Sequence, residues 1–512
     1  MQHKQRPNIL FLFSDQQRWD AIGVNNPLIK TPHLDRLAHE GMTFDRAYPP
    51  TPVCLPCRAS LVTGQYPSTH GATHNHASLP ENYETRLADV LNNAGYMTHF
   101  IGKSHLSSCH DPCSRESAPF IHNRDYYRAW HGPWYGFQRA DLAIGHTTEK
   151  HACGMHYGAW LEDQGVDTAK YFGNTGYTDY GKWDLPEKFH SSKWIADTAI
   201  ASIQSSAERE QPFYIWANFQ DPHNPCMVPE PWASMYDPAE VPYYTYHPGE
   251  PESFKTKPPH YQEITEQPGE YAAKPSDHEL EGAGNVCHLE WNEKRVRENT
   301  AAYYGMVSLM DHHIGRIISA LEASGQLDNT LIVFSADHPD CLGDHGFWFK
   351  SLLAFEEIIR VPMIVRWPAN IPADTRSKSF QNLVDLPATF CTAAGLPVPN
   401  EFEGVNQLPA WSDPAVAVRH DTVIEERPYH SGFNQRILVT DGTKCVYYAN
   451  RPYGELYATA KDPQQQHNLW DNPAYRELRE KMIRRILDHE MNKARPRLSD
   501  GEQFQINASA YA

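Results

Sequence analysis

Short runs that consist mainly of apolar residues recur along the first 400 residues, and polar side chains follow each run. Four such runs cover residues 8–13, 97–102, 213–219 and 330–335. Short runs that lack a polar face are typical of parallel strands buried on both sides, and helical patterns lie between them. We therefore predict an α/β fold in which a large mixed, mostly parallel sheet is sandwiched by helices.

Helices are expected where cap residues meet a helical spacing of apolar positions. Thr31 and Pro32 supply a cap and a first-turn proline, and Gly41 supplies a stop. The longest helical pattern runs from about residue 293 to 323 and ends near Gly325. Other expected helices cover residues 85–95, 191–208 and 383–394, and a further strand covers residues 361–367.

The pattern changes after about residue 400, where the expected strands become shorter. Asp441 and Gly442 form a hairpin signal, and Pro473 precedes a terminal helix at about 474–492. The expected strands cover residues 422–426, 436–440, 444–449 and 455–457. We predict two parts: a main α/β domain at 1–400 and a smaller C-terminal antiparallel sheet with one helix at 401–512.

Two stretches of the main domain differ in composition from the rest. Residues 107–190 and 224–290 are rich in Trp, Tyr, His, Pro and Gly and show little periodicity. They contain too many aromatic residues for disorder, so we expect long ordered insertions over the scaffold. Such surfaces suit sugar rings, and plain structural loops are the equally weighted alternative.

The overall charge and hydrophobicity limit the classes of partner. The formal net charge is −18 at pH 7, which argues against nucleic acid and anionic membranes as partners. No apolar run approaches the roughly 18 residues that span a bilayer. The start of the chain lacks the pattern of a secretory signal, so we expect a cytoplasmic protein unless a leader was removed before this numbering.

The ten cysteines are irregularly spaced in a long chain, which does not predict a disulfide framework. One group resembles a short zinc cluster: His105, Cys109, His110 and Cys113. No second ligand pair follows at a finger-like spacing, and Asp111-Pro112 interrupts the segment. We therefore favour loop residues over a structural zinc site.

Polar residues at four expected strand ends carry candidate chemistry. Parallel strands bring their C-terminal ends to one edge of the sheet, so these residues are expected to lie together. Asp15, Gln16 and Asp337 offer the oxygen ligands that Ca²⁺ or Mg²⁺ prefers, and His338 adds a nitrogen. The same set also suits Zn²⁺ or Mn²⁺. The other polar residues at these strand ends are Lys103, His105 and His223.

The segment at residues 50–64, which contains several prolines, supplies further candidate functional residues. Cys54 lies in an expected loop, and Arg58 is expected to open a helix whose N-terminus favours anions. Two interpretations stay open from these residues alone: a buried loop cysteine or a nucleophile in an anion pocket. Arg58, Lys103 and Lys350 would hold a tetrahedral anion against the metal, with Arg58 as a bidentate fork.

The segment Cys54–Gly64 resembles the C-x-P-x-R signature of the formylglycine-dependent sulfatases in the alkaline phosphatase superfamily. The resemblance extends, in chain order, to most of the chain except the aromatic insertions. The matching segments are Asp15, 31–37, 102–105, 222–223, 335–338, 342–350, 455–457, 462–463 and 467–469. It implies an alkaline phosphatase-like fold, and it makes residues 1–400 the sulfatase catalytic domain.

The resemblance also implies a mechanism. Cys54 would be oxidised to formylglycine, also called 3-oxoalanine, by a maturation enzyme. One hydroxyl of the hydrated aldehyde, bound to the metal and deprotonated with help from Asp337, would attack sulfur. His223 or Lys350 would protonate the leaving alcohol, and His105 would then assist the second hydroxyl in expelling sulfate. Lys103 and Arg58 would hold the formylglycine.

By similarity, His70 and Asn75 face the substrate, with a loop-capping role as the alternative. Four positions depart from the family pattern. Gln16 replaces a second aspartate and removes one negative charge from the metal site; that variant also occurs in phosphonate monoester and choline-ester branches. His338 stands where asparagine is common, Pro339 replaces a glycine, and Cys57 adds a second cysteine that either competes for oxidation or packs.

These observations predict a sulfuric ester hydrolase that uses Ca²⁺, with Mg²⁺ or Mn²⁺ as alternatives. Lys103 and His105 favour sulfate esters over the rival phosphonate monoester or phosphodiester substrates, because that branch tends to replace the pair with uncharged residues. A sulfated saccharide attacked from one end is the expected substrate, and a choline-sulfatase-like activity is the alternative. An inactive glycan-binding protein is the alternative from another class. The sequence does not predict the oligomeric state.

Overall fold

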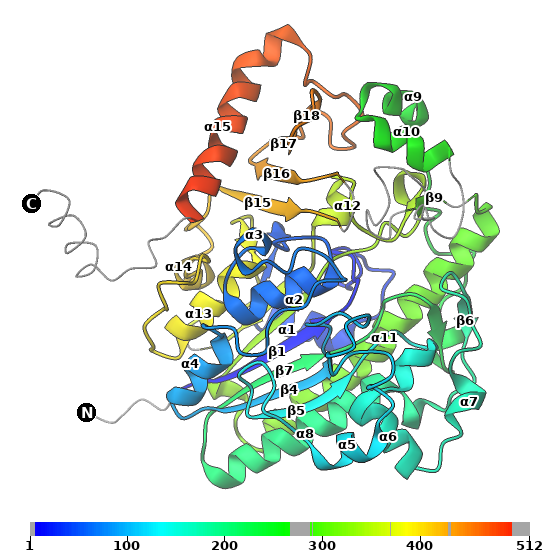
Figure 1. Cartoon of the computed structure of the whole chain (residues 1–512), viewed down its shortest axis with the longest axis vertical. Helices are drawn as coiled ribbons and strands as arrows, with labels where there is room; N and C mark the ends of the chain where they lie inside the picture. The colour runs from blue at the N-terminus through cyan, green and yellow to red at the C-terminus, as the bar shows by residue number, and fades with distance from the viewer. Residues whose placement is uncertain (1–5, 267–286, 289, 369, 429–431, 494–512) are drawn as a thin grey trace, which may run out of the picture.

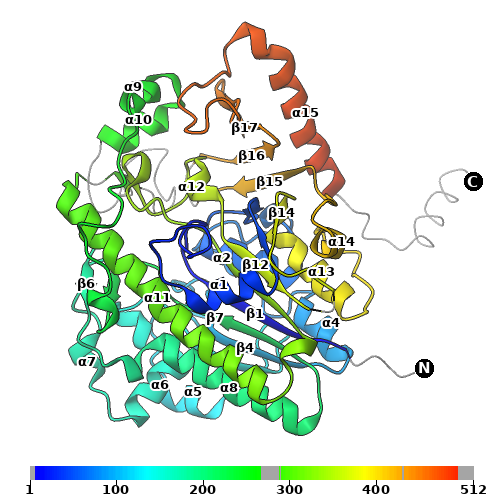
Figure 2. The same cartoon turned by 180° about the vertical axis from the view of Figure 1, so that it is seen from behind.

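The computed structural model describes residues 6–266, 287–288, 290–368, 370–428 and 432–493. Its centre is an eight-stranded sheet with the strand order β13-β2-β12-β10-β1-β7-β4-β5. Figures 1 and 2 show this sheet between helical layers, with a second, smaller sheet above it. The architecture confirms the predicted α/β fold with an additional antiparallel sheet.

The four strands that the sequence predicted most clearly lie side by side at the centre and run parallel. They are β10 (Thr330–Ala336), β1 (Asn8–Ser14), β7 (Phe213–Asn218) and β4 (Met97–Lys103). Alternate residues of a strand point to opposite faces of the sheet. Phe11 and Phe13 therefore enter one hydrophobic core and Leu12 enters the other, which explains why the whole run is apolar.

Helices cover both faces of the sheet. On the Phe11 side lie α2 (Cys54–Thr63), α4 (Leu87–Asn93) and α13 (Leu386–Ala393). On the Leu12 side lie α1 (Pro32–His39), α8 (Ser191–Arg209) and α11 (Glu293–Ala323), and Figure 2 shows α11 running along this face. The two cores therefore fix the central strands from both sides.

The outer strands make the sheet mixed. β12 (Met363–Arg366) runs antiparallel to β10, and β2 (Met42–Phe44) and β13 (Thr375–Ser377) complete that edge. At the opposite edge, β5 (Arg139–Ala143) pairs in parallel with β4. Because β5 belongs to 107–190, that stretch contributes a strand to the main sheet, and this strand was not predicted from the sequence.

The remaining part of the 107–190 stretch consists of loops and short helices, of which α5 (Arg124–Ala129) and α6 (Met155–Asp163) are the longest. In the 224–290 stretch, α9 (Glu250–Ser253) and α10 (Pro259–Glu266) are described, whereas residues 267–286 and 289 lie outside the described residues. Other short elements are β3 (Ala47–Tyr48), β6 (Tyr180–Lys182), β8 (Cys226–Val228), β9 (Cys287–His288), β11 (Phe347–Trp348), β14 (Gln381–Asn382), α3 (Pro67–His70), α7 (Thr168–Tyr171), α12 (Glu356–Ile359) and α14 (Leu408–Ser412).

The C-terminal sheet is antiparallel, as predicted. Its strands occur in the order β15 (Asp421–Glu426), β16 (Gln435–Thr440), β17 (Thr443–Tyr448) and β18 (Gly454–Tyr457). The terminal helix α15 (Arg476–Lys493) packs on one face through Met482 and Ile486. The other face packs against the loop that follows β10, and this contact brings the two sheets together.

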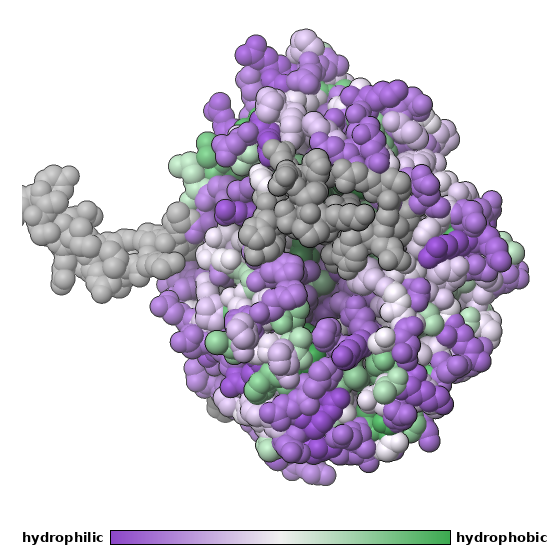
Figure 3. Space-filling model, turned by 45° about the vertical axis from the view of Figure 1, so that its right-hand side comes forward, coloured by the Kyte–Doolittle hydropathy of each residue, from purple (hydrophilic) through white to green (hydrophobic). Residues whose placement is uncertain are grey.

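Purple hydrophilic residues predominate on the face shown in Figure 3, in keeping with the net charge of −18. Across the part of the chain that the structure describes, none of the helices combines the length and the apolar character needed to cross a bilayer. All ten cysteines are free thiols, and eight of them are buried.

A buried imidazolium joins the 224–290 stretch to the loop after β10. His345 contacts a carboxylate oxygen of Glu250 through Nδ1, and its Nε2 lies 3.0 Å from Glu357 Oε2. Burial opposes the charged ring, but the hydrogen bonds to Glu250 and Glu357 outweigh burial and raise the pKa of His345 from 6.5 to about 9. This shift corresponds to about 3 kcal/mol of folding free energy at full effect.

We expect this stabilisation to be fully present below about pH 6.5 and to be lost as the pH rises through about 9. Replacing His345 by Gln should therefore lower the free energy of unfolding at pH 6 more than at pH 10. Urea denaturation across this range measures the difference. His260→Gln is the control, because burial lowers the pKa of His260 to about 3 and its ring stays neutral. An effect of His345→Gln that does not change with pH would contradict the charge assignment.

Candidate active site

The ends of the four central parallel strands bring the predicted polar residues together. Asp15 follows β1, Lys103 ends β4, His223 follows β7 and Asp337 follows β10. All four side chains are at least 99% buried. The strand-end argument from the sequence is therefore confirmed for these residues.

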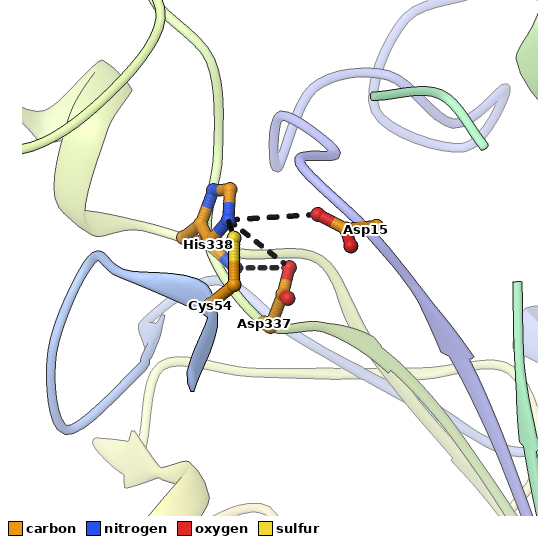
Figure 4. A group of neighbouring side chains, drawn as sticks. All are labelled: Asp15, Cys54, Asp337 and His338. Carbon is orange, nitrogen blue, oxygen red and sulfur yellow. Dashed lines mark hydrogen bonds and ion pairs between the residues drawn. The ribbon is translucent and has the colours of Figure 1, made fainter. Parts of the chain in front are cut away.

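Four side chains form a compact group of ligand atoms at this edge (Figure 4). Atoms of Asp15, Cys54, Asp337 and His338 lie within 4.8 Å of one another. His338 Nε2 is 3.5 Å from Oδ1 of both aspartates, and Asp15 Oδ1 is buried without a hydrogen-bond partner among the described residues. Two carboxylates facing one nitrogen, with one oxygen unpaired, fit a divalent cation. The oxygens suit Ca²⁺ or Mg²⁺, and the imidazole equally suits Zn²⁺ or Mn²⁺.

Arg58 lies beneath this group and stabilises both carboxylates. Its Nε donates to Asp337 Oδ2 at 3.0 Å, and Nη2 pairs with Asp337 at 2.9 Å and Asp15 at 3.2 Å. Nη1 donates to Asn218 Oδ1 and to the Lys103 carbonyl, both at 3.1 Å. Four of these contacts are hydrogen bonds, and the fifth, between Nη2 and Asp337, is an ion pair. Arg58 thus orders the ligand carboxylates, and its expected contact with an anion or with formylglycine stays a prediction.

The charges explain why two carboxylates tolerate the same buried space. Burial raises the pKa of Asp337, but the charges of His338 and Arg58 outweigh this and lower it overall. The pKa of Asp15 is also lowered, because Lys103 offsets burial and the nearby Asp337. Both groups thus remain carboxylates, the form that binds a cation.

The signature helix begins earlier than the sequence predicted. α2 starts at Cys54 itself, with Val53 as N-cap, whereas the sequence analysis placed its start at Arg58. Pro56 is compatible with the first turn because the N–H that proline lacks has no partner inside a helix there. Asn75 Oδ1 accepts a hydrogen bond from the Leu55 N–H at 3.1 Å. This bond supports the capping alternative for Asn75.

His70 is also bound within the protein. Its Nε2 lies 3.0 Å from Ser60 Oγ on α2, and its Nδ1 accepts the Ala72 N–H at 3.2 Å. The side chain is buried, and burial lowers its pKa to about 3. With both ring nitrogens engaged, His70 supports α2, which favours the capping alternative, and its expected contact with the substrate stays a prediction.

The Cys54 thiol faces several nitrogen atoms. Its Sγ lies 3.0 Å from His338 Nε2 and 3.2 Å from Lys350 Nζ. Burial disfavours the thiolate, but Lys350, His338 and Lys103 together lower the pKa of Cys54 well below its ordinary value. Cys57 differs: it packs in the hydrophobic core, and burial together with Asp337 raises the pKa of its thiol. The structure therefore places Cys57 in a packing role.

Lys350 connects three of the candidate residues. Its Nζ donates to Gln16 Oε1 at 2.6 Å and lies 2.8 Å from His223 Nε2. The amide N–H groups of Gln16 donate to Asn224 and Asp340. Both amide N–H groups of Gln16 are therefore engaged and its oxygen accepts from Lys350, and its expected role as a metal ligand stays a prediction.

Lys103 and His105 lie near the same group. Lys103 Nζ pairs with Asp15 Oδ2 and lies 2.6 Å from His146 Nε2. His105 has positive φ (54°), and its Nδ1 is buried without a partner among the described residues. His105 also contributes to lowering the pKa of the Cys54 thiol.

His146 is a residue of the site that was not predicted from the sequence. Its ring stacks on His223 with centroids 3.3 Å apart, and its Nδ1 lies 3.1 Å from Glu149 Oε2. His146 follows β5, so it obeys the same strand-end rule as the other candidates. Its signal was lost because β5 was not recognised within the aromatic stretch.

Comparisons with known proteins agree with this geometry. The Sulfatase family model matches residues 7–396, and the model for the C-terminal region of N-sulphoglucosamine sulphohydrolase matches residues 343–492. An arylsulfatase of Clostridium perfringens is 28% identical over 506 residues, covering 98% of this chain and 97% of the relative. An N-acetylglucosamine-6-O-sulfatase of Bacteroides thetaiotaomicron is 25% identical over 523 residues, covering 92% and 84%.

A similar fold occurs in the phosphonate monoester hydrolase SpPMH from Silicibacter pomeroyi. The TM-score is 0.77 at 22% identity, and the match covers 95% of this chain and 96% of that chain. This likeness supports the alkaline phosphatase-like architecture. Because the family model spans residues 7–396, which is most of the chain, the chain belongs to the sulfatase family of hydrolases.

Proposed function

We propose that the protein hydrolyses a sulfate ester through a formylglycine made from Cys54 and a divalent cation held by Asp15, Asp337 and His338. The observation that carries this proposal is the position of Cys54 Sγ, 3.0 Å from His338 Nε2 and 3.2 Å from Lys350 Nζ. An oxygen in place of that sulfur would face the cation ligands on one side and proton donors on the other. A formylglycine-generating enzyme is the implied partner.

The formylglycine and the cation would each supply a defined chemistry. The hydrated aldehyde supplies two hydroxyls on one carbon, one to attack sulfur and one to expel sulfate. The cation, Ca²⁺ or one of the alternatives above, polarises the sulfate oxygens and favours a deprotonated nucleophile. All other steps fall to side chains of this chain.

Lys350 and His223 are arranged to protonate the leaving alcohol. His223 Nδ1 lies 2.7 Å from the Asn224 carbonyl, to which it must donate, so its Nε2 carries the lone pair that faces Lys350 Nζ at 2.8 Å. Lys350 is thus the proton source in contact with the site, and His223 orients it. On the other side, the His105 ring, which acts on the Cys54 thiol, is available to accept the proton of the second hydroxyl, while Lys103 holds Asp15.

For the substrate, we propose a sulfated saccharide cleaved from one end. The aromatic stretches around the site and the similarity to an N-acetylglucosamine-6-O-sulfatase support this choice. Gln16, which removes a carboxylate from the site, favours the rival class of phosphonate monoesters and phosphodiesters. Lys103 and His105 favour sulfate. A mature Cys54 would also distinguish the enzyme from an inactive glycan-binding protein.

The test compares an aryl sulfate with the phosphate diester of the same phenol. We expect the mature enzyme to release sulfate with kcat/KM at least about tenfold higher than for diester cleavage. Dominant diester cleavage would contradict the sulfatase assignment. A panel of sulfated mono- and disaccharides, with choline sulfate as the comparison, then tests the substrate class. Activity on choline sulfate alone would contradict the saccharide proposal.

A further inference from the structure

The loop that carries Lys350 has an unusual backbone. Phe349, Ser351 and Leu352 all have positive φ, at 69°, 79° and 64°. Each non-glycine residue in this region costs about 1–2 kcal/mol, so such a run persists only where the surroundings hold it. The conformation matters because it directs Lys350 Nζ toward Cys54 and His223.

The group that holds this loop comes from the C-terminal sheet. Glu426, the last residue of β15, accepts the Leu352 N–H at 2.7 Å and the Ser351 hydroxyl. Gln435 on β16 donates to Glu426 and to the Leu352 carbonyl, the latter at 3.2 Å. The Leu352 side chain packs in the same hydrophobic cluster as Ile424.

Glu425, the residue before Glu426, holds the segment that leads to Cys54. Glu425 donates its backbone N–H to the Pro50 carbonyl at 2.8 Å, and its carboxylate accepts the Ser68 N–H at 2.8 Å. Pro50 leads into α2 and Cys54. Because adjacent strand residues point to opposite faces, the end of β15 contacts the Cys54 segment and the Lys350 loop at once.

The burial of the Glu426 carboxylate is energetically unfavourable at this position. It is 2% exposed, and no cation pairs with it in the part of the chain that the structure describes. Burial raises its pKa to about 7, although hydrogen bonds from Ser351, Leu352 and Gln435 offset part of that effect. A buried carboxylate without a countercharge lowers stability relative to an apolar side chain, so packing alone does not account for it.

We propose that Glu426 is a positioning residue for the reaction: by holding the positive-φ loop, it directs Lys350 at the leaving group. The inference rests on the proposed role of Lys350 above. It assigns the C-terminal sheet a part in catalysis, because the residue that orders the proton donor lies outside the main sheet.

The test uses Glu426→Ala and a series of sulfate esters whose leaving alcohols differ in acidity. Proton donation matters most for poor leaving groups. We expect Glu426→Ala to lower kcat about 10–100-fold for esters of weakly acidic alcohols and much less for activated aryl esters, with little change in KM. Lys350→Ala should show the same dependence. The double variant should lose little more than Lys350→Ala alone, because the two residues act as one unit.

Glu426→Gln is the matched control. Its amide oxygen still accepts from Leu352 and Ser351, and the Gln435 Oε1, which lacks a partner, can turn to accept its new N–H groups. We expect kcat within about threefold of the wild type. Where Glu426→Ala fails to fold, Glu426→Asp serves instead, since the shorter side chain cannot reach both donors.

Hydrogen exchange at the Leu352 amide gives a readout that needs no turnover. We expect faster exchange in Glu426→Ala and near-native protection in Glu426→Gln. Unchanged exchange, an equal loss of kcat across all leaving groups, or additive losses in the double variant would overturn the inference. A wild-type enzyme that releases no sulfate would instead refute the proposed function, so the two failures are distinguishable.

Discussion

Replacement of Cys54 by Ala is expected to abolish turnover while leaving the fold intact. Alanine has no sulfur to be oxidised, so neither an aldehyde nor its hydrated form can arise at this position. Removal of a nucleophile that acts together with its neighbours lowers kcat by roughly 10⁴-fold or more. Because the methyl group of alanine fits the space of the thiol, circular dichroism melts should change little. Substrate binding should persist, since Lys103, His105, His223 and Lys350 remain.

Cys57→Ala provides the matched control three residues away. Cys57 is equally buried in α2, but its thiol packs in the core, and burial raises its pKa. We expect a stability loss of about 1 kcal/mol and a kcat within about twofold of the wild type. Mass spectrometry of the peptide that contains both cysteines should show one loss of about 18 Da, the change from CH₂SH to CHO. An unmodified Cys54 in an active enzyme would contradict the proposed mechanism.

The sequence predicted the central strands and the position of their polar ends because a single physical rule governs both. A parallel strand buried on two faces must be apolar, and its neighbours must end at the same edge. Asp15, Lys103, His223 and Asp337 therefore come together without any knowledge of side-chain contacts. The rule failed for β5, whose five residues include Arg139 and Asp141 and so lack an apolar run.

The roles of Arg58 and Gln16 could not be predicted from residue type. Arginine suits a bound anion as well as a carboxylate of the protein, and only the contacts of Arg58 show that it pairs with Asp15 and Asp337. Gln16 offers an oxygen that suits a metal, and only the structure shows that this oxygen accepts from Lys350 and that the residue has a positive φ (58°). Such choices depend on long-range hydrogen bonds, which local patterns do not contain.

The backbone conformation of the Lys350 loop could not be predicted from the sequence either. Positive φ is normally signalled by Gly or Asn, yet Phe349, Ser351 and Leu352 carry neither signal. Their conformation depends on Glu426, which lies 74 residues beyond Leu352 in the chain. A strain that distant residues maintain leaves no trace in the local sequence, and it occurs here beside the residue proposed to donate the proton.

Asp337→Asn is expected to remove both the cation and the chemistry. Asp337 Oδ1 is one of the ligand atoms facing His338 Nε2 at 3.5 Å, and Oδ2 accepts from Arg58. An amide lowers the ligand charge, and it also turns an N–H group toward either the cation or the guanidinium. Loss of one charged ligand should weaken cation binding at least about 100-fold and lower kcat by about 10²–10³-fold. Metal content after dialysis and kcat at saturating Ca²⁺ measure the two effects.

The control for Asp337→Asn must remove a buried carboxylate far from the cation. Asp311 on α11 meets this need: it is 1% exposed and accepts the Leu34 N–H at 2.7 Å, and burial raises its pKa to about 7. Asp311→Asn should change the free energy of unfolding but leave metal content and kcat near wild type. If Asp337→Asn instead behaved like Asp311→Asn, retaining its metal and its rate, the ligand assignment would be wrong. A loss of metal in Asp337→Asn alone places the cation between β1 and β10, where the two carboxylates meet above Arg58.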